Sequence, residues 1–343
     1  MTRFINIHTL ISHPSSMMNR DDSGLQKTAI FGGVTRSRIS SQCLKRAIRQ
    51  SEIYSNAVEE VSIRTNKFDE LLALCIKELP ETEPKLIEDV LLHLGSKVKK
   101  DKNKETGETK RIFDAVQPYS IGAIREAIHM IEAGTELKAL KNIPHIPTLD
   151  VALSGRMDAS CPIRNVEAAM SVAHSLTTHT ADIEVDWFTA CDDLAEQGSG
   201  HIGTTEFSSG VFYRYASINL DLLAQNTQKS KAELSDTINT IVRCFAQVSP
   251  SAKQKTFAAH NHADFVLVTQ SDQPLSLANA FRSAIKNKSD VMEVSIKSLV
   301  THYEKLVSGY ELNSKALAFD MTDSANSEQI KLVNKLSELV FID

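Results

Sequence analysis

The chain has 343 residues, of which 24% are charged and 42% are apolar, and its formal net charge at pH 7 is −5. This composition is typical of a water-soluble globular protein, and the length predicts two domains or one elaborated domain. No apolar run reaches membrane-spanning length, and the N-terminal stretch is too short for a signal peptide. Five cysteines without CxxC spacing argue against a disulfide framework or a zinc knuckle. We therefore expect a soluble cytoplasmic protein.

Apolar periodicity predicts interleaved strands and helices, and hence an α+β sheet domain with insertions. The pattern begins with a strand over 4–11 and a polar loop over 13–33. Further strands are expected over 36–40, 210–220 and 264–269, and residues 169–178 are compatible with a strand. Helices are expected over 41–54, 66–79, 83–95, 121–132, 229–247, 276–286, 291–307 and 327–339. Residues 97–111 are charged and predict a mobile surface loop, and the stretch from 182 to 209 predicts a projecting hairpin or loop.

Positive charge is concentrated in residues 20–50. This segment contains seven basic and two acidic residues, a local balance of +5, so the rest of the chain carries −10. Such asymmetry is typical of a protein that binds a polyanion in one place. The basic residues are Arg20, Lys27, Arg36, Arg38, Lys45, Arg46 and Arg49, and the acidic ones are Asp21 and Asp22. Strand alternation would place Arg36, Arg38 and Ser40 on one side.

The start of the helix after this strand is a predicted phosphate site. Ser40 or Ser41 is suited to cap the helix, and the free amides at a helix start attract anions. Lys45 and Arg49 lie four residues apart and share one helical face. Gly32 and Gly33 allow a ligand or partner to approach the backbone closely. The alternative is a solvated amphipathic helix after a glycine turn.

Two pairs of residues outside the basic segment, each with a large apolar side chain, also suggest nucleic-acid contact. Arg156 and Met157 join a phosphate-binding side chain to a flexible apolar one that can wedge between bases, although Met157 also suits a buried core position. Trp187 and Phe188 are flanked by acidic residues and followed by a glycine-rich segment, which favours exposure over a place in the core.

Catalytic signatures are scarce. The sequence has no P-loop, GxGxxG, GxSxG or HExxH motif. His260, His262 and Asp264 resemble part of a metal site, but Asp264 also suits a turn cap at a strand start. We predict no catalytic residue, no metal and no cofactor.

Other polar residues are predicted to be structural. The pair Asp21 and Asp22 is expected to order the basic loop through local pairing. His174 and His179 are expected to be structural or surface residues, and Asp192, Asp193 and Glu196 a solvated acidic face.

Long motifs in the chain resemble the CasC family, the backbone subunit of the type I-E CRISPR surveillance complex Cascade. They include FINIH, NRDD, AIFGG, RISSQ, VALSGRM, AMSVAHSLTTH, DIEVDWFTACDDL and AKQKTFAAHNHAD. The resemblance spans nearly the whole chain and weakens over 56–150 and at the C-terminus. It implies an α+β fold with an RRM-like (ferredoxin-like) palm, a helical fingers insertion and a projecting thumb. The implied ranges are 1–55, 166–180 and 211–343 for the palm, 56–165 for the fingers and 181–210 for the thumb.

The resemblance also assigns roles to individual residues. Guide contacts are implied for Arg20, Lys27, Arg38, Ser40, Gln42, Lys45 and Arg49. Met157 would insert where the guide is kinked, supported by Trp187, Phe188, Thr189, His201 and Ile202 of the thumb. Val34 and Gln50 replace bases found in relatives, so the groove is expected to be less basic here, and the segment after Met157 is shorter than in relatives.

The resemblance implies a non-catalytic subunit that polymerises head-to-tail along a CRISPR guide RNA in antiviral defence. Its partners would be the guide, a target DNA strand paired to the guide, further copies of itself, and the large, small and two guide-end-capping subunits of Cascade; no membrane is implied. Two other functions remain open from the residues. One is a metal-dependent nuclease that uses His260, His262 and Asp264 or the pair Asp21 and Asp22. The other is a generic RRM-like protein that binds single-stranded RNA.

Overall fold

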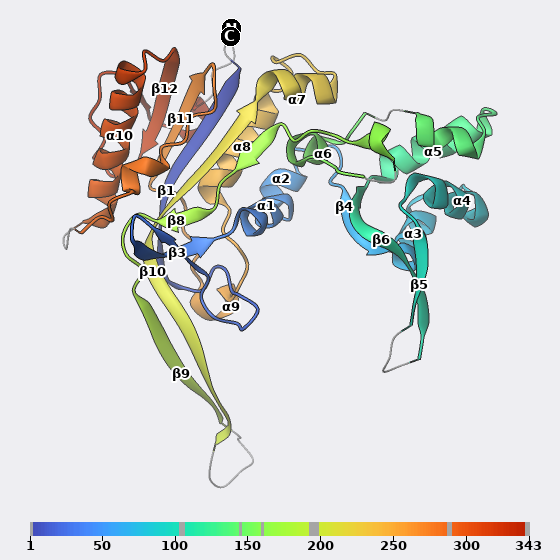
Figure 1. Ribbon diagram of the computed structural model, residues 1–343, viewed down its shortest axis with the longest axis horizontal. Helices are drawn as coiled ribbons and strands as arrows, with labels where there is room; N and C mark the ends of the chain where they lie inside the picture. Colours follow the sequence, from blue (N-terminus) through green and yellow to red (C-terminus); the bar gives the residue numbers. More distant parts are fainter. Residues whose placement is uncertain are drawn as a thin grey trace. The chain divides into compact units, whose positions relative to one another are not determined.

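The computed structural model describes residues 3–102, 107–143, 146–158, 161–191, 199–286 and 290–339 (Figure 1). The chain divides into two compact units. The first comprises residues 1–57, 171–220 and 231–343, and the second comprises residues 58–170 and 221–230. Within the described ranges, no helix is both long and apolar enough to cross a membrane. The fold is mixed α+β, which confirms the predicted class.

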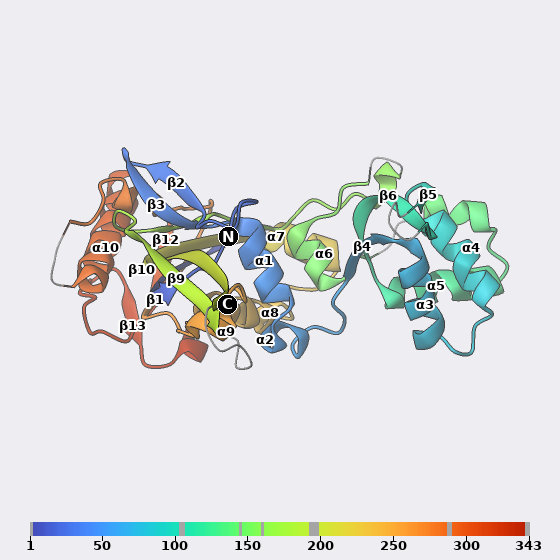
Figure 2. The ribbon, with the colours of Figure 1, turned by 90° about the horizontal axis from the view of Figure 1, so that it is seen from below.

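The first unit is built on one large sheet. Its strands lie in the order β13-β12-β11-β1-β10-β8-β3-β2, and β7 and β9 also pair with β10. Along this order neighbours are antiparallel except for β12 and β13, which are parallel, and β9 is antiparallel to β10. Figure 2 shows β2 and β3 side by side. The bounds are β1 Phe4–Ser16, β2 Thr28–Phe31, β3 Val34–Ile39, β7 Met170–Val172, β8 Ser175–Thr177, β9 Ile183–Cys191, β10 Ser199–Asn219, β11 Phe265–Ser271, β12 Ser314–Asp320 and β13 Lys331–Val333.

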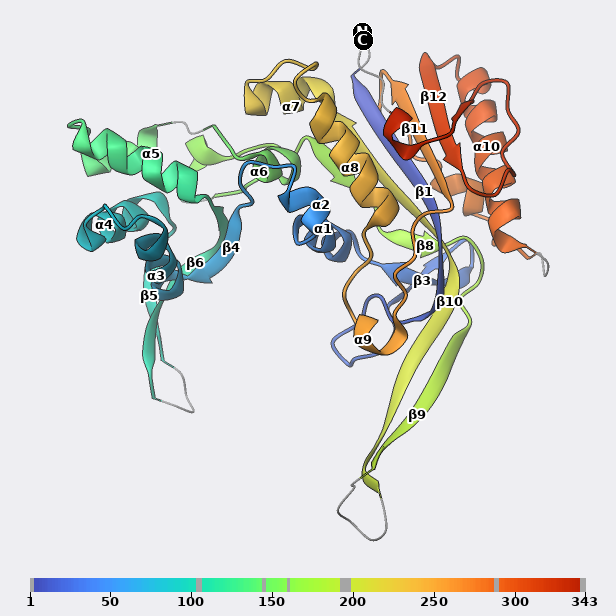
Figure 3. The same cartoon turned by 180° about the vertical axis from the view of Figure 1, so that it is seen from behind.

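The centre of this sheet is buried because helices pack on both of its faces. Phe265 and Leu267 of β11 share a core with Leu299 of α10 (Val291–Gly309). From the opposite face of β10, the Arg214 Nη1 atom donates a hydrogen bond to the carbonyl oxygen of Phe245 in α8 (3.3 Å). Figure 3 shows α8 (Ser235–Gln247) lying across β1 and β10. Alternate residues of the central strands therefore enter two separate cores.

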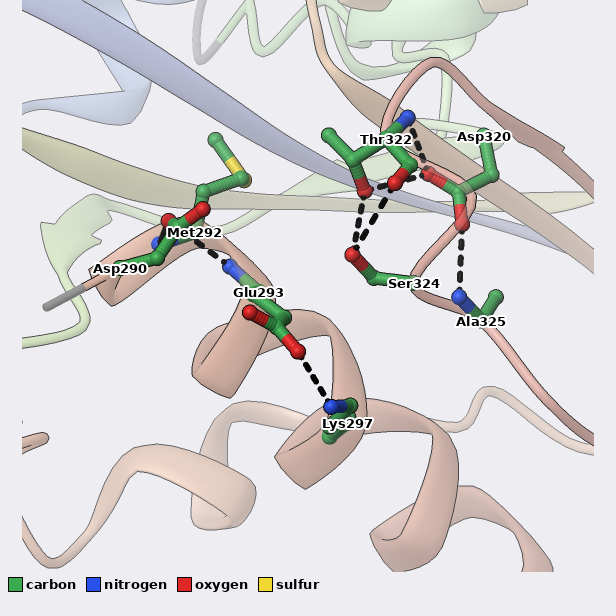
Figure 4. A network of polar contacts seen from close by, with 8 residues as sticks. All are labelled: Asp290, Met292, Glu293, Lys297, Asp320, Thr322, Ser324 and Ala325. Carbon is green, nitrogen blue, oxygen red and sulfur yellow. Dashed lines mark hydrogen bonds and ion pairs between the residues drawn. The ribbon is translucent and has the colours of Figure 1, made fainter.

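Polar contacts fix the start of α10 and the end of β12 (Figure 4). The Asp290 Oδ1 atom caps α10 by accepting hydrogen bonds from the backbone N–H groups of Met292 (2.9 Å) and Glu293 (3.2 Å). At the end of β12, the Asp320 carboxylate accepts hydrogen bonds from the backbone N–H groups of Thr322 and Ala325. Both aspartates thus satisfy backbone donors where regular structure begins or ends.

The second unit has its own core around a three-stranded sheet. The strand order is β4-β6-β5, and the ring of Phe113 lies between those of Phe68 and Tyr119, with centroids 5.2 and 5.0 Å away. Its main elements are β4 Ile63–Lys67, α3 Phe68–Glu78, α4 Pro84–Leu94, β5 Val98–Lys102, β6 Thr109–Tyr119, α5 Ile121–Glu132 and α6 Leu149–Ser154. The shorter pieces of the chain are α2 Glu52–Ser55, η1 Leu137–Asn142, η2 Pro162–Arg164, α7 Leu220–Thr227, α9 Gln254–Phe257, η3 Ala278–Phe281 and η4 Leu336–Glu338.

Several expected elements are wrong. The charged stretch 97–111 contains the paired strands β5 and β6, with residues 103–106 outside the described residues, so the second unit is not purely helical. The helix expected over 276–286 is replaced by the short η3, and the one over 327–339 by β13 and η4. The helix expected over 41–54 ends at 49, because Ser51 caps the separate helix α2.

Acidification is expected to destabilise the first unit through His8 and His13. Burial lowers the pKa of both imidazoles to about 3, and the Arg214 charge adds to the effect at His13. In the unfolded chain each imidazole titrates near its ordinary pKa of about 6.5. As the pH falls from 6.5 toward 3, the unfolded chain binds protons that the folded chain excludes. The free energy of unfolding should therefore fall by about 1.4 kcal/mol per pH unit for each histidine, as measured by urea titrations at successive pH values.

The variant His13→Gln separates this effect from the titration of carboxylates. Glutamine can still accept the hydrogen bond that Arg214 Nη2 donates to His13 Nε2 (3.0 Å), but it does not titrate. Its stability should fall less steeply with pH than that of the wild-type protein. His260→Gln, at an exposed position of the first unit, is the matched control for the introduced glutamine. Equal slopes for His13→Gln and the wild-type protein would contradict this assignment.

Candidate nucleic-acid interface

Helix α1 (Ser41–Arg49) begins at a serine cap and has no acidic residue in its first turn. The Ser40 Oγ atom accepts a hydrogen bond from the backbone N–H of Cys43 (3.3 Å). Two buried apolar residues hold the helix in place, and two arginines occupy its last turn. Since no carboxylate compensates the positive end of the helix dipole within the first turn, this end favours an anion.

The polar loop 19–27 lies along β3 and the start of α1. The Lys27 backbone N–H donates to the Asn19 carbonyl oxygen (3.0 Å), and the Arg38 backbone N–H donates to the Lys27 carbonyl oxygen (2.9 Å). The Asn19 Oδ1 atom accepts a hydrogen bond from the Ser40 backbone N–H (2.9 Å). The fold therefore brings Lys27 next to Arg38 and Ser40, which lie more than ten residues later in the chain, and all three were predicted to contact the guide.

Arg20 lies on a turn that an aspartate orders. Arg20 forms a β-bridge with Gln26, and its side chain is exposed. The Asp21 Oδ1 atom accepts hydrogen bonds from the backbone N–H groups of Ser23 and Leu25, both at 2.9 Å. The ordering role predicted for Asp21 is therefore confirmed.

The remaining predicted contacts of the basic segment lie on α1. Gln42 is exposed in the first turn, and Lys45 and Arg49 are half-buried. Since Lys45 and Arg49 lie one helical turn apart, they present two cations on one face of α1. Nothing in the structure tests their contact with RNA, so this role stays a prediction.

Arg36 does not belong to this surface. Its guanidinium is fully buried and donates hydrogen bonds to the carbonyl oxygens of Thr177 (2.9 Å), Phe281 (2.9 Å) and Phe31 (3.3 Å). Arg36 and Arg38 lie two residues apart on β3, as expected, but the Arg36 guanidinium is used within the fold, where it satisfies backbone carbonyl oxygens. Burial lowers the pKa of Arg36.

A histidine that sequence reasoning missed lies beside the cluster. The His174 Nδ1 atom accepts a hydrogen bond from the Ser41 backbone N–H (3.1 Å). Burial lowers the pKa of His174, and the charges of Arg38 and Lys27 lower it further. We use the name basic cluster for Lys27, Arg38, His174 and the α1 start at Ser40 and Ser41. No spacing rule links residue 174 to residue 41, so only the folded chain reveals this contact.

The predicted thumb is a hairpin of β9 and β10, and residues 192–198 at its turn lie outside the described residues. These include Asp192, Asp193 and Glu196. In the described strands, Trp187 faces Thr204 and Thr189 faces Ile202 across the pair. Trp187, Phe188 and Ile202 expose 73%, 42% and 61% of their surface, and Thr189 is also exposed. This confirms the predicted exposure of Trp187 and Phe188. His201 pairs through its backbone with Ala190.

The base of this hairpin adjoins the basic loop. The Glu206 Oε2 atom accepts a hydrogen bond from the Gln26 backbone N–H (2.9 Å). The Ser208 and Ser37 hydroxyls are hydrogen-bonded at 3.0 Å. Two of the predicted features, the basic loop and the thumb, are thus joined within the first unit.

Met157 belongs to the second unit, which is described by itself. The backbones of Arg156 and Val166 exchange two hydrogen bonds (3.0 and 2.9 Å), and Arg156 Nε donates to the Arg164 carbonyl oxygen (2.9 Å). Met157 lies between Arg156 and the buried Asp158, yet it exposes 87% of its surface. The alternative that Met157 fills a core gap is therefore wrong. Arg156 is half-buried with its Nε turned inward, and no observation tests its predicted contact with RNA.

The histidines and aspartate considered for a metal site do not form one. Asp264 Oδ2 accepts a hydrogen bond from the backbone N–H of Ser12 in β1 (3.1 Å), so its side chain has a structural role, through a distant strand and not through a local turn. Burial raises the pKa of Asp264, and the charges of Asp290 and Asp320 raise it further. Among the described residues, no three His, Cys, Asp or Glu side chains lie in positions that could hold a metal ion.

Comparisons with solved structures point to one kind of assembly. A chain described as "CRISPR RNA-guided surveillance complex, pre-nicking" is 28% identical with a TM-score of 0.83, and the match covers 98% of this chain and 97% of that chain. A second, described as "CRISPR RNA-guided surveillance complex", is 25% identical with a TM-score of 0.65 and coverage of 98% and 96%. No curated protein matches the sequence. The model of the CT1975-like protein family matches residues 5–341, nearly the whole chain, and the chain therefore belongs to this family.

Proposed function

We propose that this protein is the non-catalytic, guide-RNA-binding backbone subunit of a type I-E CRISPR surveillance complex. It polymerises along the guide and presents it in short segments for pairing with target DNA in antiviral defence. The single observation that carries this proposal is the basic cluster: cationic side chains gathered at a helix start that has no acidic residue in its first turn. The similarity to surveillance-complex chains supports the same function.

The chemistry of the basic cluster suits a guide of any sequence. Lysine, arginine and helix-start amides recognise phosphate oxygens, which carry no sequence information. A subunit that accepts any guide needs this kind of contact, since the base edges must stay free for pairing with the target. Lys27 and Arg38 are half-buried, and their side chains require no cofactor for this role.

Exposed apolar side chains supply the second element of the proposal. Trp187 and Ile202 stand on one face of the thumb hairpin, and Met157 projects from the second unit. A protein keeps such large apolar side chains in water only at a cost, so exposed groups of this kind favour contact with bases or with another subunit. In the proposed assembly they displace one nucleotide of the guide at regular intervals.

The proposed assembly is a head-to-tail filament with an RRM-like palm in each subunit. Contacts that do not close into a ring produce a helical array whose length follows the RNA. Its other partners would be the large, small and two guide-end-capping subunits, in the cytoplasm. In this proposed function the protein binds and positions nucleic acid and catalyses no chemical reaction.

Charge reversal on α1 is expected to release the guide. In Lys45→Glu/Arg49→Glu, two cations that face the proposed backbone become anions, so affinity for RNA should fall roughly 100-fold or more, given the strength of charged hydrogen bonds. The measurement is guide copurification, followed by titration with a labelled RNA at several salt concentrations.

Lys305→Glu/Lys331→Glu is the matched control, because it makes the same change in net charge at two exposed positions of the first unit. It should bind RNA nearly as the wild-type protein does. Circular dichroism and thermal unfolding verify that both double variants are folded. Normal guide retention by a folded Lys45→Glu/Arg49→Glu protein would refute the α1 assignment.

Shortening the thumb is expected to separate RNA binding from assembly. Replacing residues 187–204 by Asn-Gly leaves the facing pair Asp186 and Thr205 joined by a favourable two-residue turn. The shortened protein should keep its affinity for short RNA but lose length-dependent filaments and target capture, as judged by electron microscopy and DNA binding. Filaments that still opened duplex DNA would contradict the thumb assignment.

A nuclease assay distinguishes the proposed function from the main competing one. Labelled RNA and DNA incubated with the protein and Mg²⁺ or Mn²⁺ should remain intact. Cleavage that disappears in Asp21→Asn or in His260→Ala would establish catalysis and overturn the non-catalytic part of the proposal. RNA binding without discrete, length-dependent assemblies would instead favour a generic single-strand binder.

A further inference from the structure

His174 has a position that its sequence context did not suggest. It lies between β7 and β8, is exposed, and its Nδ1 atom accepts a hydrogen bond from the Ser41 backbone N–H at 3.1 Å. Ser41 is the first residue of α1. The imidazole therefore occupies the helix start at which the basic cluster is assembled.

This hydrogen bond fixes where the imidazole carries its proton. A backbone N–H can only donate, so Nδ1 must present a lone pair. The neutral ring then carries its hydrogen on Nε2. Protonating Nδ1 would break the contact with Ser41 and would place a third positive charge near Lys27 and Arg38, the two charged groups that act on the ring. Burial and both charges lower the pKa of His174, which is the direction that favours the neutral ring required by the hydrogen bond from Ser41.

A neutral N–H donor beside two cations suits one kind of ligand. Nε2 has no lone pair in this tautomer, so it can only donate, and a phosphate oxygen held near Lys27 or Arg38 is the matching acceptor. The same two residues would repel a cationic ligand, and an uncharged ligand would not neutralise their positive charges.

We propose that His174 contacts the bound RNA by donating a hydrogen bond from its neutral imidazole to a backbone phosphate oxygen, while its other ring nitrogen holds the start of α1. This inference rests on the proposed function and adds a residue and a protonation state to it. His174 thus links the helix start to the ligand through one ring.

Three substitutions separate the contact with RNA from the contact with α1. His174→Ala removes both hydrogen bonds. His174→Asn offers an oxygen where Nδ1 lies, but its amide is too short to reach where Nε2 lies. His174→Gln places an N–H₂ group near the Nε2 position. We expect about 3- to 10-fold weaker binding of a short labelled single-stranded RNA by the Ala and Asn variants, the size of one neutral hydrogen bond, and recovery of most of the affinity in the Gln variant.

Thermal unfolding tests the structural alternative. His174→Asn should unfold at the wild-type temperature although it binds RNA less tightly. If His174→Asn instead bound RNA as the wild-type protein does while His174→Ala did not, the histidine would serve only as a helix cap and the inference would fall. His129→Ala, an exposed histidine of the second unit, is the matched control and should leave RNA affinity unchanged.

Salt dependence tests the neutral state of the ring. Losing one cation from a phosphate contact reduces the slope of log affinity against log salt by about 0.7 for a single strand. Lys27→Gln should show this reduction, whereas His174→Ala should keep the wild-type slope at pH 7.5. A reduced slope for His174→Ala would mean that the ring binds as an imidazolium, and would overturn the proposal. Wild-type RNA affinity of both Lys45→Glu/Arg49→Glu and Lys27→Gln would refute the proposed function itself, so the two failures are distinguishable.

Discussion

The hydrogen bonds made by Asn19 are the constraint on which the basic cluster depends. Its side-chain oxygen accepts from the Ser40 N–H, and its carbonyl oxygen accepts from the Lys27 N–H. One residue thus joins the polar loop to the cap of α1, and the loop in turn pairs with β3 at Arg38. Because three separate pieces of chain meet there, side chains of like charge are held close together in spite of their repulsion. The hydrogen bonds to the backbone offset that repulsion.

Apolar periodicity correctly predicted several helices, whose hydrogen bonds are local. It failed for segments whose conformation depends on pairing with a strand elsewhere in the chain. The amphipathic helices α3, α4 and α5 match their expected ranges within two residues. Residues 97–111 were expected to form a loop because they are charged, yet Lys99 forms an ion pair with Asp114 across the hairpin (3.5 Å). The final segment was expected to be helical, but residues 331–333 extend the sheet beside β12. A pattern within one segment cannot show that a strand elsewhere offers it free hydrogen-bonding groups.

The candidate site was predictable in its charges but not in its geometry. Local composition identified Lys27 and Arg38 as members of a cationic segment, and the serine cap was expected at Ser40 or Ser41. Composition could not tell Arg38 from Arg36, because both lie on one strand and only the fold surrounds Arg36 with carbonyl oxygens. It also gave no reason to connect His174 with α1. Met157 shows the same limit: its exposure follows from the paired backbone of its neighbours, Arg156 and Val166, and not from its own character.

The continuous strand β10 has a consequence for how the hairpin of β9 and β10 can vary between related proteins. One 21-residue strand runs from the hairpin into the centre of the sheet, where it pairs with β1. Inserting a single residue into β9 would turn every later side chain, Trp187 included, to the opposite side of the ribbon. Length should therefore change in steps of two, or at the tip alone, so that natural insertions and deletions in this arm are predicted to be even-numbered between its base and Thr189.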